Sequence, residues 1–273
     1  MRSVLLALVA VVAFAANSLT ARAALAESAN DPFAFALVRL FAGAFILAAF
    51  VRARPGLRDL PGSAALAIYM FGFAAAYTAI NTATGALILF SAVQITVLGI
   101  SAARGERLRT MGILGCVVAL AGLVLLLYDS LASAPVTAIL AMLAAGVAWG
   151  VYTILGRASK DPVQQTAWQF LMASVLSLPM LLAIDGFGQG PVLTLEGVLL
   201  ATASGAVFSG MGYALWYAVA PKLPAASVAS VQLLTPVVAA VMGMVALNEA
   251  LDATFVLASL IILAGVALTL KKA

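Results

Sequence analysis

The residues that could carry chemistry in this chain are a few polar and aromatic side chains set within long apolar runs. Arg39 is the basic residue placed well inside such a run, where it could bind a carboxylate or act as a gating charge. Amides, phenols and indoles could supply hydrogen bonds and stacking surfaces, and these belong to Asn17, Tyr77, Asn81, Gln94, Trp149, Tyr152, Tyr213, Trp216 and Gln232. This set predicts an uncharged or zwitterionic organic ligand, held by stacking and a few hydrogen bonds.

Groups required for enzymatic or metal chemistry are missing from the sequence. There is no histidine and only one cysteine, Cys116, so histidine bases, most histidine metal sites and an internal disulfide are excluded. No Gly-x4-Gly-Lys-Ser/Thr motif occurs, which excludes ATP hydrolysis by this chain. We therefore expect no catalytic residue, no metal, no cofactor and no nucleic-acid partner.

The elements that must position these side chains are apolar spans. Of the 273 residues, 65% are hydrophobic and 9% are charged, against about 45–50% and about 25% in an average soluble domain. Such a chain needs a lipid bilayer as its solvent, and ten runs approach the ~20 residues that cross one. Backbone N–H and C=O groups cannot remain unpaired in lipid, and the runs lack the alternation of apolar and polar residues that a β-barrel needs. We therefore predict helices at 3–22, 33–51, 63–80, 84–103, 110–128, 135–156, 163–184, 197–219, 225–247 and 253–270.

Charge distribution predicts the orientation of these spans. With the N-terminus inside, all fourteen basic residues except Arg22 and Arg39 fall at inner ends or in inner loops. Retention of positive charge on the cytoplasmic side therefore predicts that both termini are cytoplasmic. No Asp or Glu falls in the middle of a span, which favours facilitated diffusion or exchange over proton coupling.

The chain contains an internal repeat. Residues 106–127 and 249–270 share eight identical positions, and each segment follows a long apolar run. We therefore divide the chain into a first five-helix repeat, 1–130, and a second, 131–273. Five spans are an odd number, so the second repeat must be inverted relative to the first. Two inverted halves around a central cavity are typical of transporters that work by alternating access.

The repeated motif also carries a family resemblance. In the first copy it comprises Gly105-Glu106-Arg107-Leu108 with Gly112, Gly115 and Gly122, and in the second Thr235-Pro236, Asn248-Glu249-Ala250-Leu251 and Gly265. This pattern resembles the drug/metabolite transporter superfamily, in the branch of ten-helix proteins made of two EamA-type repeats. The first copy has Val93-Gln94 where the family favours proline, and Asn248 stands where glycine is usual. The resemblance implies export or exchange of small metabolites across the bacterial inner membrane.

Within that family the chain is similar overall to the YddG-type amino-acid exporters. We therefore expect a multi-pass inner-membrane transporter that exports or exchanges amino acids, preferably neutral, aromatic or hydrophobic ones, without ATP. Efflux of another small metabolite or drug by the same mechanism is the alternative. A membrane-embedded enzyme and a channel are rival classes that the sequence does not favour. Ten helices can enclose one cavity alone, so we expect a functional monomer in the lipid bilayer.

Several residues have a structural interpretation beside the functional one. Arg39 could instead reach the outer surface or pair with Asp31, and Gln94 could serve as an interhelical hydrogen bond. Tyr77 and Asn81 lie near the outer end of their span, where aromatic residues often mark the membrane interface. Pro236 could be a hinge or a static kink. Glycines within the spans are expected to permit close helix packing, and Glu106 and Glu249 to cap helices.

Overall fold

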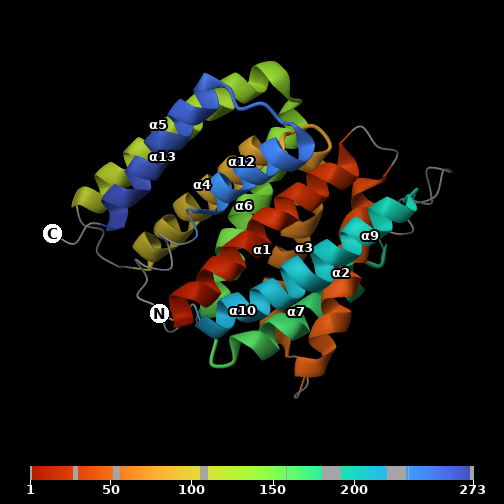
Figure 1. Ribbon diagram of the computed structural model, residues 1–273. Coiled ribbons are helices and arrows are strands. Elements are labelled where there is room, and N and C mark those ends of the chain that lie inside the picture. The colour runs from red at the N-terminus through yellow and green to blue at the C-terminus, as the bar shows by residue number, and fades with distance from the viewer. Residues whose placement is uncertain are drawn as a thin grey trace.

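The computed structural model describes residues 2–26, 30–51, 56–104, 110–157, 159–179, 192–219, 232 and 234–270. All regular elements in these ranges are helical (Figure 1). They are α1 (Arg2–Leu25), α2 (Pro32–Leu47), the 3₁₀ turns η1 (Ala48–Phe50) and η2 (Leu57–Asp59), α3 (Leu60–Tyr77), α4 (Thr82–Ala103), α5 (Thr110–Ser133), α6 (Val136–Arg157), α7 (Pro162–Ser177), α9 (Leu195–Ala203), the π-helix η3 (Ser204–Met211), α10 (Gly212–Val219), α12 (Leu234–Leu247) and α13 (Ala253–Leu270).

The helices confirm an all-α membrane protein with ten spans. In this count α9, η3 and α10 form one span, because they follow one another without a break. Six helical stretches in the described residues are long and apolar enough to cross a bilayer by themselves. Apolar side chains of both long and shorter helices are exposed on the outside of the bundle: Phe45 of α2 is 82% exposed and Val245 of α12 is 74% exposed. Such surface is stable only against lipid. The parts of the predicted spans at 180–184, 225–231 and 233 lie outside the described residues.

Local sequence explains where the helices begin. Asp31 accepts a hydrogen bond from the backbone N–H of Ala34 at 2.7 Å, and Pro32 occupies the first position of α2. The same Asp-Pro pair recurs at the start of α7, where Asp161 caps the helix. An N-cap carboxylate satisfies a free donor, and a proline at the first position loses no hydrogen bond. Asp31 is thus a cap, and its pairing with Arg39 does not occur.

The last helices of the two repeats pack side by side (Figure 1), and glycines set their separation. Gly122 of α5 lies opposite Ile262 of α13, and Gly265 lies opposite Ala119. Residue numbers rise in one helix as they fall in the other, so α5 and α13 run antiparallel. Inverted repeats require this arrangement. The predicted packing role is therefore confirmed for Gly122, and Gly265 shares it, but the same prediction is wrong for Gly99, where a Cβ would meet nothing within 4 Å.

Substitution of Gly265 by valine should weaken this pair. A Cβ at Gly265 would lie 2.7 Å from the carbonyl oxygen of Gly115 and still closer to the backbone of Ala119. Backbone atoms cannot rotate away, so we expect a loss of about 1–3 kcal/mol and a lower thermal unfolding midpoint in detergent. Gly99→Val is the matched control, because a Cβ there meets nothing within 4 Å. Equal midpoints for the two variants would contradict the packing role.

The remaining helices interleave the two repeats. In the first repeat, α3 and α4 pack against α6, which belongs to the second. In the second repeat, α9, η3, α10 and α12 pack against α1, which belongs to the first. Each repeat therefore completes its core with the opening helix of the other, and the central residues lie between the two.

The π-helix η3 is fitted to α2 by close glycine contacts. A Cβ on Gly205 would collide with the backbone carbonyl of Arg39, and one on Gly210 would lie 2.6 Å from the side chain of Ile46. Gly43 of α2 faces the carbonyl oxygen of Gly205 in return. This close approach brings Ser209 of η3 up to the side chain of Arg39. Short π segments of this kind are frequent at functional sites.

Candidate functional site

A small cavity lies where five helices meet at the centre of the bundle. Its volume is about 10 Å³, the room of roughly one water molecule. An organic substrate can therefore enter only if the surrounding helices move apart. The lining residues are Phe14 and Asn17 of α1, Tyr69 and Phe73 of α3, Leu89 and Phe90 of α4, Trp149 of α6 and Tyr213 of α10.

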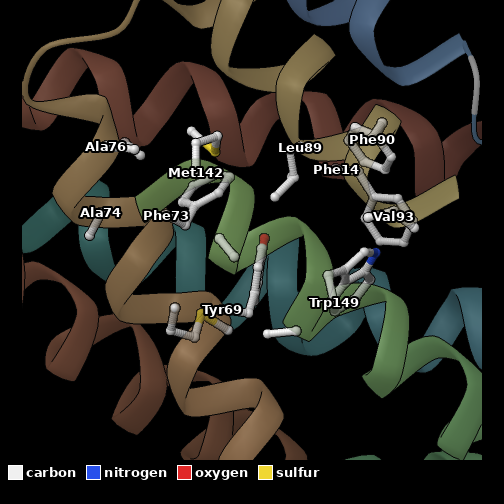
Figure 2. Close-up of a cluster of buried hydrophobic side chains, with 14 of the residues drawn as sticks. Phe14, Tyr69, Phe73, Ala74, Ala76, Leu89, Phe90, Val93, Met142 and Trp149 are labelled. Carbon is white, nitrogen blue, oxygen red and sulfur yellow. The ribbon is translucent and has the colours of Figure 1, made fainter. Parts of the chain in front are cut away.

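Trp149 is the centre of an aromatic cluster around this cavity. Its ring centroid lies 4.6 Å from that of Tyr213 and 5.0 Å from that of Tyr69. Tyr152 stacks on it from the next turn of α6 at 5.2 Å, and Phe14 meets it edge-on at 6.0 Å. Figure 2 shows Phe14, Tyr69 and Trp149 approaching this region from three different helices. The cluster offers flat apolar faces to a ligand and leaves only the small cavity between them.

Arg39 lies behind this aromatic wall with its side chain fully buried. Its Nη2 donates to the hydroxyl of Tyr69 at 3.0 Å, and its Nε donates to Ser209 Oγ at 3.1 Å. The guanidinium carbon also lies 4.7 Å from the centroid of Phe73. Among the described residues no carboxylate pairs with Arg39, and its Nη1 has no hydrogen-bond partner. The side chain therefore does not reach the surface. Its charge is stabilised by the hydroxyl groups of Tyr69 and Ser209 and by aromatic rings.

A hydrogen-bonded chain connects Arg39 to Asn17. Because Ser209 Oγ accepts from Arg39, it gives its own proton to Asn17 Oδ1, at 3.1 Å. Ser204 Oγ donates to the same oxygen at 2.7 Å. Both lone pairs of Asn17 Oδ1 are therefore used, whereas its Nδ2 finds no partner within the described part of the chain.

One end of the bundle is closed by a second polar cluster, around Glu249. Its carboxylate accepts from Arg22 Nε at 3.2 Å and from the backbone N–H of Thr82 at 2.8 Å. Arg22 also donates to the backbone carbonyl of Tyr77 at 3.2 Å. The cluster thus joins the ends of α1, α3 and α4 to the segment between α12 and α13. Glu249 caps a helix as predicted, but the helix is α4 of the other repeat.

Local backbone geometry places Glu249 in this position. Asn248, which follows the last residue of α12, has a φ of 54°, in the left-handed region that asparagine tolerates better than most residues. The turn brings the Glu249 N–H to the carbonyl of Gly243 at 3.2 Å. A Cβ on Gly243 would lie 2.5 Å from the Glu249 carboxylate and 2.9 Å from Thr82, so this position requires glycine.

Comparison with known proteins gives the family. Residues 136–271 match the EamA-like transporter family. An uncharacterized protein of Pseudomonas aeruginosa is 44% identical over 276 residues, covering 98% of this chain and 94% of that protein. The chain belongs to the EamA-like transporter family. An uncharacterized transporter of Archaeoglobus fulgidus is 29% identical over 263 residues, 89% of each chain. A solved crystal structure at 21% identity has the same fold, with a TM-score of 0.69 and 98% of both chains covered.

Of the residues predicted to bind substrate in this EamA-like transporter, one group gathers at the centre. Asn17, Trp149 and Tyr213 line the cavity. Tyr152 stacks behind Trp149, and Trp216 lies 5.7 Å from Phe14 between ring centroids. Asn17 thus borders the cavity directly, whereas Tyr152 lies one ring behind it.

The other predicted residues of the transporter lie away from the cavity lining. Asn81 is the N-cap of α4 and accepts from the backbone N–H of Thr84. Tyr77 is fully buried near that end, with its ring against Gly85. Gln94 and Gln232 are buried, at 7% and 3% exposure, and neither borders the cavity.

Pro236 lies in α12, whose described part begins at Leu234, and Gln232 just before that part is helical as well. Residue 233 and residues 220–231, which precede it, lie outside the described residues. The hinge role of Pro236 therefore stays a prediction.

Sequence reasoning missed Tyr69 and Phe73 as lining residues of the EamA-like transporter, although a signal was present. Tyr69, Phe73 and Tyr77 recur every four residues on α3, and their rings contact in series at 5.3 Å and 4.7 Å. Tyr213 and Tyr217 have the same spacing in the matching helix of the second repeat. An aromatic row repeated in both halves is a stronger indication of a shared wall than any single ring.

Proposed function

We propose that this EamA-like transporter exports or exchanges amino acids, preferably neutral aromatic and hydrophobic ones, by alternating access without ATP hydrolysis. The observation that carries the proposal is an aromatic cavity backed by buried Arg39 at the junction of the two repeats. Rings of Trp149 and Tyr213 would hold the side chain of the substrate, and Asn17 and Arg39 would bind or attract its carboxylate. Tyr152 and Trp216 would support the wall.

The mechanism follows from the position of the cavity and from its closed walls. Helices of both repeats border the cavity, so a rocking motion of one repeat against the other would open it to either side in turn. In the closed form described here the rings fill the site. Described acidic side chains with low exposure, Asp59 and Glu249, lie at helix ends, so the proposal includes no proton relay through the centre.

We place the protein in the bacterial inner membrane with both termini in the cytoplasm, as its charge distribution predicts. The Glu249 cluster then lies at the outer end. We further propose that the monomer is functional, because ten helices can enclose one cavity alone.

Counterflow in proteoliposomes tests this function. Vesicles would be loaded with unlabelled threonine, methionine, phenylalanine, tryptophan, lysine or glutamate, and uptake of the same labelled amino acid measured against protein-free vesicles. We expect saturable, stereoselective exchange of the neutral members, unaffected by an imposed pH gradient. Non-saturable flux would indicate a channel. No exchange of any member by folded protein would refute the amino-acid assignment and leave efflux of another metabolite or drug.

A further inference from the structure

The free hydrogen-bonding groups of the central cavity are mostly donors. Asn17 Oδ1 already accepts hydrogen bonds from Ser204 and Ser209, so Asn17 can offer a ligand only the N–H groups of Nδ2. Trp149 Nε1, which can only donate, has no partner among the described residues and is 2% exposed. Both residues belong to the cavity lining. A buried donor without an acceptor costs about 1–3 kcal/mol, so a ligand that supplies acceptors would be favoured.

Tyr69 adds a third donor to the same lining. Its hydroxyl oxygen accepts from Arg39 Nη2 at 3.0 Å, so its own proton remains available to a ligand. The positive charge on Arg39 polarises that hydroxyl and makes it a stronger donor. In this arrangement Arg39 acts on a ligand through Tyr69, without having to enter the cavity.

Groups that would bind an ammonium ion are weaker: the unpartnered hydroxyl of Tyr213 could accept from it and the ring faces could attract it, but they carry no negative charge. The lining, as the described residues define it, includes neither aspartate nor glutamate. Its one amide oxygen is already saturated by two serines. A free amide oxygen does occur on Gln165, but this residue lies in the first turn of α7 and does not border the cavity. The charge nearest the cavity is that of Arg39, which would repel a cation.

We infer that the cavity recognises a carboxylate in preference to an ammonium group, so that its substrates include aromatic carboxylates without an amino group. Tyr69 O–H, Asn17 Nδ2–H and Trp149 Nε1–H bind the carboxylate oxygens, with the Arg39 charge behind them. The rings of Phe14 and Tyr213 hold the apolar part. This inference rests on the proposed function. It specifies that the cavity recognises the carboxylate of an amino acid rather than its ammonium group.

Binding of three related compounds to the purified protein tests the inference. Phenylalanine carries both charged groups, 3-phenylpropionate only the carboxylate, and 2-phenylethylamine only the ammonium. Isothermal titration calorimetry at pH 7 gives their dissociation constants without interference from passive permeation. We expect 3-phenylpropionate to bind at least as tightly as phenylalanine, and 2-phenylethylamine to bind about thirtyfold more weakly or worse.

Tyr69→Phe identifies the donor, because it removes the hydroxyl and keeps the ring. We expect its affinity for 3-phenylpropionate to fall about tenfold or more, as when a hydrogen bond to a charged group is lost. Tyr217→Phe is the matched control, since it loses a buried hydroxyl that is not in the cavity lining. Equal affinities in these two variants would overturn the role of Tyr69.

The outcomes separate this inference from the proposed function. Binding of 3-phenylpropionate without binding of phenylalanine would support the inference and refute transport of phenylalanine. Binding of phenylalanine and 2-phenylethylamine, with 3-phenylpropionate inactive, would overturn the inference and leave amino-acid transport standing. Failure of all three compounds to bind folded protein would overturn the inference, while counterflow with the remaining amino acids would still decide the proposed function.

Discussion

Replacing Arg39 with glutamine should reduce counterflow of phenylalanine about thirtyfold or more while the protein remains folded. Arg39 is fully buried and has no carboxylate partner among the described residues, so its charge costs several kcal/mol of desolvation that no ion pair offsets. Loss of the charge removes the attraction for a substrate carboxylate, for which about 2 kcal/mol or more is typical of a buried charge contact. The same loss relieves the desolvation cost, so the thermal unfolding midpoint should stay level or rise.

Two further variants make the result specific to the charge of Arg39. Arg39→Lys keeps a positive charge but loses the fork that reaches Tyr69 and Ser209 together, so we expect it to retain part of the transport rate. Arg58→Gln removes an exposed positive charge outside the site and should transport at the parent rate. Counterflow by Arg39→Gln at the parent rate would show that Arg39 is only a structural residue.

Replacing Glu249 with glutamine should make the end of the bundle near Thr82 open more readily. The carboxylate is 11% exposed, accepts from Arg22 and Thr82, and joins the two repeats there. Hydrogen bonds to a charged group contribute about 1.5–3 kcal/mol each, so loss of the charge should raise the open population about tenfold or more. Asp252→Asn is the matched control, because Asp252 caps only its own helix, through the N–H of Phe255.

A cysteine at Thr20 reports this opening. Thr20 is 8% exposed, lies on α1 near Arg22, and bonds only to backbone carbonyls of its own helix. With Cys116 changed to serine, the rate at which a membrane-impermeant maleimide labels Thr20→Cys follows the open population. Faster labelling with Glu249→Gln, but not with Asp252→Asn, is the expected result. Equal rates in all three backgrounds would mean that the Glu249 cluster does not hold this end closed.

The spans could be predicted from the sequence because a helix that crosses a bilayer must consist mainly of apolar residues. Every predicted span that the structure describes contains a helix, and helix ends such as Asp31-Pro32 carry their own caps. The packing of Gly122 could be predicted from its place as a small residue within a span. Asn81 carried a comparable local signal as an N-cap, which its polar character led us to interpret as a binding group instead.

The partners of Arg39 could not be read in the same way. Tyr69 and Ser209 lie 30 and 170 residues away along the chain and reach Arg39 only when three helices pack. The π-helix η3 that presents Ser209 depends on contact between Gly205 and the backbone of α2. Neither relationship has a local pattern in the sequence. The candidate site could thus be predicted as a group of aromatic and amide residues, but its chain of donors and acceptors could not.

The interleaving of the two repeats has a consequence for biosynthesis. When α3 and α4 leave the ribosome, their partner α6 has not yet been made. In the same way α1 cannot form its contacts with α9, α10 and α12 until those helices are made. The first five helices are therefore inserted into the membrane before most of their long-range contacts can form, which exposes them to misassembly. Proteins whose contacts are this distant in sequence fold slowly. Because the charge of Arg39 meets Ser209 only after η3 is made, quality control during insertion must tolerate an incompletely solvated arginine until synthesis is nearly complete.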